Sequence, residues 1–343
     1  MATLKELSEY TGYSITTISR VLNNDPTMSA SDATRSAILE AAGALNYKKP
    51  SSRQRHESRG KLRFGVAEML SPVEQLEDPY YLYLKNHAMQ HCMDLGHTTI
   101  SLLEQAGSYQ LSAGESLDGI LAIGIFSEEQ IASLSDLHSN LVFLDSAPDE
   151  RRFDSVVINF KLGVEQALET LIERGHRRIG FLGPYRKLDE RKRPAPEVRR
   201  QYFIDYMKQQ GLFREDYLFE AKMTATAAHQ TLRGQIQAGG ELPTALLTAN
   251  EEAAFGAIRA LHEAGLRVPE DMSVISFNDT PLSALTDPPL TSISTHVECM
   301  SRVAVELLVQ RTRGTSGHIP LKIVVPPTLT ERASVSTIED AEA

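Results

Sequence analysis

Residues 3–23 have the sequence TLKELSEYTGYSITTISRVLN, which predicts two short helices separated by a tight turn. Leu4 and Leu7 lie three residues apart and therefore share one face of the first helix. Thr3 precedes this helix and Glu6 follows three residues later, which is the spacing of a capping box. The stretch therefore predicts a helix that begins directly after Thr3.

The second helix follows a glycine turn and has two different faces. Gly12 allows a turn that would strain other residues, and Ser14 can accept hydrogen bonds from the free N–H groups of the next turn. One face is apolar and is formed by Ile18, Val21 and Leu22. The other face is short and mostly polar, and it is formed by Ile15, Thr16, Thr17, Ser19 and Arg20.

The polar face suits a helix that enters the major groove of DNA, because it has few acids to repel phosphate. The same pattern also occurs in ordinary helical hairpins, so other features must distinguish the two. A third amphipathic helix follows, in which Ile38, Leu39, Ala42 and Leu45 are expected to close a three-helix core.

Charge is distributed unevenly along the 343 residues. The whole chain has a net charge of −10, which by itself argues against nucleic acid. Residues 1–63, however, contain 10 basic and 6 acidic residues, and the segment 48–63 alone contains seven basic residues and one acid. A basic head on an acidic body is typical of a DNA-binding module joined to a domain of another function.

The order of these motifs, followed by Leu45-Asn46-Tyr47, resembles the head of the lactose/galactose repressor (LacI/GalR) family, and the resemblance extends over residues 2–332. It implies a homodimer that binds double-stranded operator DNA. Three residues of the second helix would read bases: Ile15, Thr16 and Arg20. Contacts to the DNA backbone are expected from the head and the basic linker: Thr3, Ser14, Thr17, Asn23, Lys48, Lys49, Arg53 and Arg55.

The hinge that joins the head to the body departs from the family pattern. The family usually has a leucine here that wedges into the minor groove, whereas residues 51–56 read SSRQRH. A wedge must be apolar to unstack bases, and by spacing His56 or Arg55 takes its place. We therefore expect a hinge, including Ser51, Ser52 and His56, that binds DNA by charge.

From Leu62 onward, short apolar runs alternate with amphipathic helices, which predicts parallel sheets covered on both faces. Strands are expected at 62–67, 98–103, 119–123, 141–145, 154–158, 177–182, 244–249, 271–277, 290–294 and 323–325. Helices are expected at 79–95, 128–137, 161–174, 197–210, 251–263 and 297–311. The predicted fold class is α/β, with an all-α helix-turn-helix head and a bilobed body of two doubly wound parallel sheets. The resemblance implies the same fold, similar to periplasmic binding proteins.

The predicted domains are a DNA-binding domain at 1–47, a linker at 48–61, an effector-binding and dimerisation body at 62–332 and a disordered tail at 333–343. The resemblance implies three crossings between the lobes, expected near 158–161, 289–293 and 318–322. Lobe 1 would then contain 62–158 and 292–319, and lobe 2 would contain 159–290 and 320–332. The tail has no leucine heptads, which favours a dimer over a tetramer.

Signatures of catalysis, metal binding and membrane insertion are absent from the sequence. It contains no P-loop, nucleophile elbow, zinc-protease motif or dinucleotide-binding glycine motif, so we expect neither an enzyme nor a cofactor. His87 and His91 are four residues apart without a third ligand nearby, and Cys92 and Cys299 are the only cysteines. No apolar run approaches the roughly 20 residues of a membrane span, and we expect a cytoplasmic protein.

Polar residues at the ends of predicted strands mark a candidate effector site. Asp145, Asn250 and Asn278 each end an apolar strand, and open α/β sheets bind ligands beyond the carboxyl ends of their strands. For any one such residue, capping of the next helix is the more common role. The resemblance implies that all three contact the effector together with Arg199, which begins an Arg-x-x-x-Phe pattern. Three apolar residues are candidates to pack against the effector: Phe126, Ile158 and Met223.

The leading interpretation is a repressor that responds to a galactoside-like sugar, because hydroxyls need paired donors and acceptors. Two alternatives stay open. One is a family regulator with a nucleobase or a phosphorylated carrier protein as corepressor, although aromatic side chains are sparse at the expected cleft positions. The other is a solute-binding protein without a DNA role, against which the basic head argues.

The basic linker leads to a prediction about salt. Operator affinity should fall with a slope of about −0.9 in log–log form for each phosphate that the protein neutralises. Replacement of Lys48, Lys49, Arg53 and Arg55 by Gln should make this slope shallower in mobility-shift titrations at several salt concentrations. An unchanged slope would show that the linker does not touch phosphate.

Overall fold

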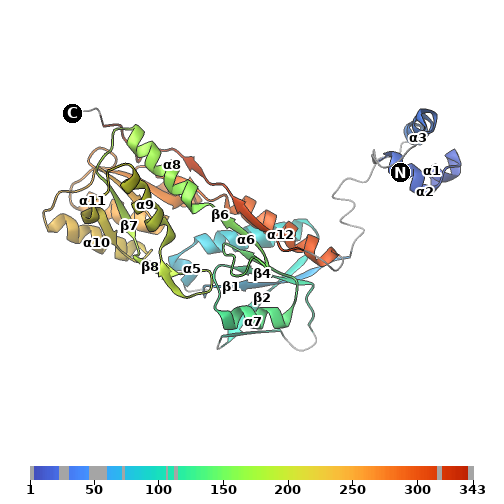
Figure 1. Cartoon of the computed structure of the whole chain (residues 1–343), viewed down its shortest axis with the longest axis horizontal. Coiled ribbons are helices and arrows are strands. Elements are labelled where there is room, and N and C mark those ends of the chain that lie inside the picture. The colour runs from blue at the N-terminus through green and yellow to red at the C-terminus, as the bar shows by residue number, and fades with distance from the viewer. Residues whose placement is uncertain are drawn as a thin grey trace. The chain divides into compact units, whose positions relative to one another are not determined.

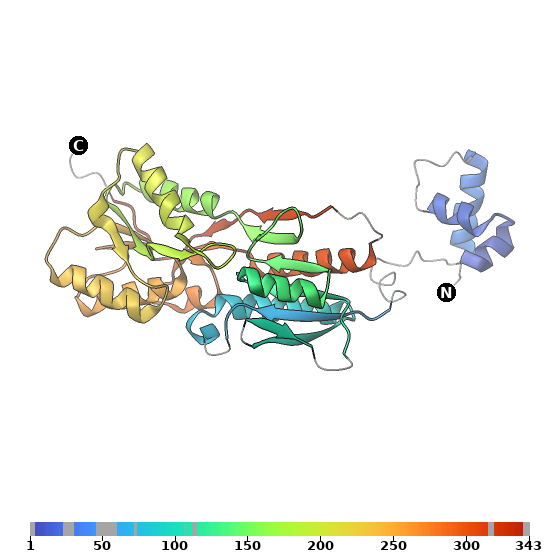
Figure 2. The ribbon, with the colours of Figure 1, turned by 60° about the horizontal axis from the view of Figure 1, so that its bottom comes forward.

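The computed structural model describes residues 4–22, 31–45, 60–71, 74–105, 107–111, 115–314 and 319–338. The chain divides into two compact units, a head within residues 1–61 and a body from Leu62 onward. Figure 1 labels many of the helices and strands, and Figure 2 shows the same ribbon from a second direction. No helix within the described ranges is long and apolar enough to span a membrane.

The head contains the helices α1 (Leu4–Thr11), α2 (Ile15–Leu22) and α3 (Asp32–Ala44). The turn between α1 and α2 is as predicted, because Gly12 has a φ of 72°. The Ser14 hydroxyl accepts a hydrogen bond from the Thr17 N–H at 3.1 Å, which confirms the predicted cap. Thr3, the expected cap of α1, lies outside the described residues.

Side chains from all three helices form the core of the head: Leu7, Ile18, Val21, Ile38, Ala41 and Ala42. The prediction that Leu39 helps to close this core is wrong, because Leu39 is 57% exposed. Leu39 follows Ile38 directly and therefore points about 100° away from it around the helix. Ala41 takes the inward position instead, and Leu45 packs against the edge of the core.

Lobe 1 of the body is a mainly parallel sheet with helices on both faces. Its strand order is β14-β6-β5-β4-β1-β2-β3, and β3 pairs antiparallel with β2. Figure 1 shows α6 and α12 together on the sheet, and α7 on the other side. The strands are β1 (Arg63–Glu68), β2 (Thr98–Gln105), β3 (Ser108–Gln110), β4 (Gly119–Ile123), β5 (Leu141–Leu144), β6 (Asp154–Ile158) and β14 (Lys322–Val325). The helices are α5 (Glu74–Glu77), α6 (Tyr80–Asp94), α7 (Glu128–Leu137) and α12 (Val297–Arg313).

Lobe 2 has the same architecture, with strand order β10-β7-β11-β12-β13-β15 and β15 antiparallel to β13. Helices α10 and α11 share one apolar core, and α8 and α9 share another. The strands are β7 (Ile179–Gly183), β10 (Leu218–Glu220), β11 (Ala245–Thr248), β12 (Ser273–Asn278), β13 (Thr291–Ser294) and β15 (Thr328–Thr330). The helices are α8 (Phe160–Glu173), α9 (Val198–Gln209), α10 (Ala225–Gln237) and α11 (Glu251–Glu263), with short 3-10 turns η1 (Glu215–Tyr217) and η2 (Pro281–Leu285).

A separate hairpin, β8 (Arg186–Leu188) and β9 (Pro194–Pro196), joins β7 to α9 and was not predicted. It belongs to neither large sheet. The predicted fold class, a helical head followed in the chain by two doubly wound α/β lobes, is confirmed by the head's helices, the two sheets and their flanking helices.

The chain crosses between the lobes after Ile158, at residues 295–296 and at residues 326–327. Two of the expected crossings are therefore wrong: β13 belongs to the sheet of lobe 2 and β14 to the sheet of lobe 1. The last crossing falls on Pro326-Pro327, and proline has no N–H with which to continue a ladder. At the second crossing His296 has a φ of 54°, which ends β13 before α12 begins.

The expectation of a disordered tail from Ala333 is wrong for residues 333–338. The Ser334 hydroxyl donates to the Val274 carbonyl at 2.6 Å and accepts from the Thr291 N–H at 2.8 Å. The Ile338 N–H donates to the Arg174 carbonyl at 2.8 Å. These contacts fix the segment along lobe 2. Residues 339–343 lie outside the described residues.

Packing between α10 and α11 gives a test of the fold with a matched control. A Cβ added at Gly256 in α11 would lie 2.1 Å from the Ala225 carbonyl oxygen, whereas one added at Gly234 in α10 meets nothing within 4 Å. Gly256→Ala should therefore destabilise the body by about 1–3 kcal/mol, as overpacking does. Gly234→Ala should stabilise it by about 0.5–1 kcal/mol through helix propensity. Thermal melting of both variants measures the difference, and equal shifts would contradict the α10–α11 packing.

Candidate functional site

The exposed side of α2 presents the residues predicted to meet DNA. Ile15 is 47% exposed, and Thr16 and Arg20 are also exposed. Ser14 lies at the start of the helix, where its hydroxyl is 2.9 Å from the Thr17 hydroxyl. An α-helix presented in this way fits the width of the major groove.

Most of the other residues predicted to contact the DNA backbone or to form the hinge lie outside the described residues: Thr3, Asn23, Lys48, Lys49, Ser51, Ser52, Arg53, Arg55 and His56. Their assignment stays a prediction from the sequence.

The body contains a cavity of about 740 Å³ between its lobes. Lobe 1 contributes Asp145 and Ile158 at the carboxyl ends of β5 and β6, and lobe 2 contributes Phe160 and Arg199 at the starts of α8 and α9. This is the position in which open α/β sheets bind ligands. The cavity therefore brings together Asp145, Ile158 and Arg199, three of the residues predicted from the sequence.

Asp145 forms a hydrogen-bonded cluster with two tyrosines. Its carboxylate accepts from the Tyr80 hydroxyl at 3.3 Å and from the Tyr81 hydroxyl at 3.1 Å. Burial raises the pKa of Asp145. Nearby Lys187, Tyr81 and Arg199 act to lower this pKa, but they offset the effect of burial only in part. Asp145 also has a φ of 71°, a conformation that costs energy in a residue other than glycine. A strained acidic residue that accepts hydrogen bonds at a strand end is well placed to bind hydroxyl groups.

Arg199 is a buried cation that is held from several sides. It is 3% exposed, it pairs with Glu197 at the start of α9, and its Nη1 donates to the Ala249 carbonyl at 2.6 Å. Its guanidinium lies 4.8 Å from the centre of the Phe160 ring, within the range of a cation–π contact. Although burial acts to raise the pKa of Glu197, Arg199 and then Lys187 hold it below its usual range.

Asn250 and Phe126 are not among the residues that line the cavity, and their assignment to the effector stays a prediction. Asn250 is fully buried and caps α11: its Oδ1 accepts from the Ala253 N–H at 3.0 Å. Its amide donates to the Met223 carbonyl at 3.0 Å and to Glu252 at 2.9 Å. Phe126 is fully buried in the core under α7. The contacts that the structure shows for these two residues are therefore those of a helix cap and of the core.

Asn278 is also separated from the main cavity. It lines a different cavity of about 430 Å³ with Asp279 and His296, next to the second crossing between the lobes. Met223 lines a third cavity of about 420 Å³, and its sulfur lies 3.6 Å from Arg199 Nη2. The third cavity adjoins the main one, because Tyr81, Ile125, Lys187 and Leu188 line both.

Sequence reasoning missed several residues of the cleft: Asp78, Tyr81, Phe160, Lys187, Glu197 and Tyr202. The Asp-Pro-Tyr-Tyr motif at 78–81 was a visible signal for the first two. The prediction that aromatic side chains are sparse in the cleft is wrong, because Tyr81, Phe160 and Tyr202 line it.

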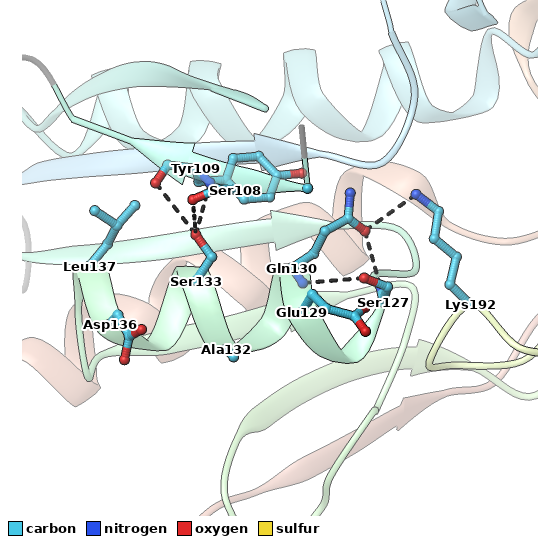
Figure 3. A pocket seen from close by; sticks show the side chains of 11 residues that line it. Ser108, Tyr109, Ser127, Glu129, Gln130, Ala132, Ser133, Asp136, Leu137 and Lys192 are labelled. Atoms are coloured by element: carbon cyan, nitrogen blue, oxygen red, sulfur yellow. Dashed lines mark hydrogen bonds between the residues drawn. The ribbon is translucent and has the colours of Figure 1, made fainter. Parts of the chain in front are cut away.

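A larger cavity of about 830 Å³ lies on the outside of lobe 1, between β3 and α7. Figure 3 shows that its polar side chains mostly bond to each other. Ser133 accepts from the Tyr109 N–H at 2.8 Å, and Ser127 and Gln130 form the capping box of α7. Since these groups satisfy local structure, the cleft between the lobes is the better candidate site. No group of three or more metal-ligating side chains occurs in the described part of the chain.

Comparison with known proteins identifies both units of the chain. Residues 3–50 match the model described as "Bacterial regulatory proteins, lacI family", and residues 168–335 match the periplasmic binding protein-like domain. The chain is 32% identical to the HTH-type transcriptional regulator GalR of Streptococcus thermophilus over 341 residues, which cover 99% of each protein.

Solved structures agree in fold with the chain. A Lac repressor dimer bound to operator and the anti-inducer ONPF has a TM-score of 0.65 at 23% identity, covering 98% of this chain and 99% of that one. A complex of the regulator CelR with cellobiose has a TM-score of 0.67 at 23% identity, covering 97% of this chain and 100% of that one. At these identities the likeness concerns the fold.

A buried acid behind the cleft gives a prediction about pH. Glu252 is 7% exposed, and burial, followed by the Asp78 carboxylate, raises its pKa from 4.5 to about 8. The folded protein therefore holds a proton that the unfolded chain releases, so this residue's contribution to stability falls as pH rises between these two values.

Glu252→Gln removes the ionisation and keeps an oxygen acceptor for Asn250. Its melting temperature should exceed that of the wild type by more at about pH 8.5 than at about pH 5.5. Glu220→Gln, a change to an exposed carboxyl on β10, is the matched control. A difference that does not depend on pH would contradict the raised pKa of Glu252.

Proposed function

Because this chain belongs to the LacI family of bacterial regulatory proteins, which are DNA-binding transcriptional regulators, we propose that it is a repressor whose operator affinity changes when a neutral sugar binds between its lobes. The observation that carries the sugar part of the proposal is the shared cavity of Asp145, Tyr81 and Arg199. Family membership confirms the predicted family and the prediction that the chain is a regulator rather than an enzyme.

The chemistry of the cleft suits a ligand with many hydroxyl groups. Asp145 supplies a carboxylate acceptor, Arg199 a cationic donor, and Phe160 and Ile158 an apolar surface for a sugar face. Such a mixture of apolar walls and a few convergent polar groups is typical of small-molecule sites.

For the head, we propose that α2 enters the major groove and that Ile15, Thr16 and Arg20 read base edges. An arginine can bond both acceptors of a guanine edge, and an isoleucine can contact a thymine methyl group. Ser14 and Thr17 would bind the DNA backbone, which fixes the register without reading sequence. The active form proposed is a cytoplasmic homodimer on a two-fold operator, the symmetry typical of such dimers.

A nucleobase corepressor is the second candidate, and the aromatic lining of the cleft favours it. Tyr81, Phe160 and Tyr202 line the cavity and could stack on a flat ring. Calorimetry distinguishes the candidates when wild-type protein is titrated with galactose, lactose and cellobiose in one series and with adenine, guanine and hypoxanthine in another. Binding of a base and not of a sugar would replace the sugar proposal by this one.

Two variants separate DNA reading from sugar sensing. Arg20→Ala should lose about 1–3 kcal/mol of operator discrimination and keep sugar binding. Asp145→Asn should keep operator binding and weaken sugar binding, because a charged acceptor becomes a neutral one, with a cost of about 1 kcal/mol.

Mobility shifts with operator and calorimetry with sugar measure both variants. The amide introduced by Asp145→Asn can still bond to both tyrosines, since its oxygen accepts from one hydroxyl and its NH2 group donates to the other. This change therefore disturbs folding less than removal of Arg199, which would leave Glu197 buried without its partner. If Asp145→Asn released operator at the same sugar concentration as the wild type, the effector site would lie elsewhere.

A further inference from the structure

The β8–β9 hairpin is built around a rigid turn. The Asp189 carboxylate accepts from the N–H groups of Arg191 at 2.8 Å and Arg193 at 2.9 Å. The Asp189 N–H in turn donates to the Arg193 carbonyl at 2.7 Å. Three hydrogen bonds around one turn, with Lys192 at a φ of 60°, fix the positions of the residues on both strands.

This turn reaches from lobe 2 to lobe 1. Arg191 Nε donates to the Pro148 carbonyl at 2.7 Å, and its Nη1 lies 3.4 Å from the Glu128 carboxylate. Lys192 Nζ donates to Gln130 Oε1 at 3.3 Å, as Figure 3 shows. The hairpin therefore spans the two lobes over the cleft, and Figure 1 shows β8 near their junction.

The hairpin also forms a wall of the cleft. Lys187 and Leu188 on β8 line both the main cavity and the adjoining one. Lys187 lies in the electrostatic field of Asp78, Asp145 and Glu197, each of which interacts with its charge. Within the described part of the chain, the Lys187 ammonium forms no hydrogen bond or ion pair.

Lys187 thus differs from Arg199, the buried cation of the cleft. Arg199 already donates to Glu197, to the Ala249 carbonyl and to the Met223 sulfur. Lys187 has three N–H donors, none of them used by the described residues, at the place where the two cavities meet. An ammonium held among carboxylates and lacking a direct partner can donate to ligand hydroxyls without first breaking a bond.

We propose that Lys187 is an effector-binding residue, which donates hydrogen bonds to sugar hydroxyls at the junction of the two cavities, and that the β8–β9 hairpin is the cover of the effector site. This inference rests on the proposed function, and it adds a residue that the sequence did not suggest. The cover explains why a hairpin outside both sheets is fixed to lobe 1 by Arg191 and Lys192.

The test compares Lys187→Met, which keeps most of the length of the side chain and removes its donors, with Lys187→Arg, which keeps positively charged donors. Lys208→Met, an exposed change on α9, is the matched control. Loss of hydrogen bonds to a charged group should weaken sugar binding roughly 10- to 100-fold in Lys187→Met. Lys187→Arg should recover part of this loss, and Lys208→Met should bind as the wild type does.

Calorimetry with galactose, lactose and cellobiose gives these affinities, and melting curves without sugar show whether each variant is folded. If the wild type binds one of the sugars and folded Lys187→Met binds that sugar with equal affinity, the role of Lys187 would be overturned and the proposed function would stand. Equal losses in Lys187→Met and Lys208→Met would also overturn it. Failure of the wild type to bind any of the three would count against the sugar proposal itself and against this inference together.

Discussion

The three crossings of the chain between the lobes are the constraint on which the body depends. In lobe 1, the register places Ile158 beside Val325, and in lobe 2 it places Ser294 beside Thr328. The strands that lead into and out of the crossings are thus neighbours in each sheet. Connections that lie together restrict the lobes to rotation about a common hinge, which is one of the usual forms of domain closure around a ligand.

The buried ion pair of Arg199 and Glu197 holds the start of α9 in place where lobe 2 borders the cleft. A guanidinium that is 3% exposed needs a partner, because a buried charge without one costs several kcal/mol. Glu197 precedes α9 and accepts from the Arg199 backbone N–H at 3.2 Å as well as from its side chain. The start of the helix and the charge of the cleft are therefore determined by the same two residues.

The sequence predicted the regular parts of the fold well and the site only in part. α7, α11, β4 and β6 begin and end where periodicity and capping residues predict, because these signals are local. The sheet to which β13 or β14 belongs is decided by pairing with distant strands, such as Ile275 with Thr291, which no local pattern contains. Local sequence is equally ambiguous at the site. An asparagine at the end of a strand, such as Asn250, has the same sequence pattern whether it caps a helix or binds a ligand. The β8–β9 hairpin, rich in charge and proline, carried no periodic signal at all.

The placement of the polar groups decides how a ligand could act on the lobes. Asp145 and Tyr81 belong to lobe 1, whereas Arg199 and Lys187 belong to lobe 2. A sugar held as proposed would bond to both sets only when they face each other across the cleft. The affinity of the sugar would therefore differ between arrangements of the lobes. This difference in binding free energy sets the upper limit on how far the sugar can shift the populations of these arrangements. Contacts confined to one lobe would add affinity to every arrangement equally and would shift nothing. Residues that bind from opposite lobes are thus the ones that can couple sugar binding to the operator.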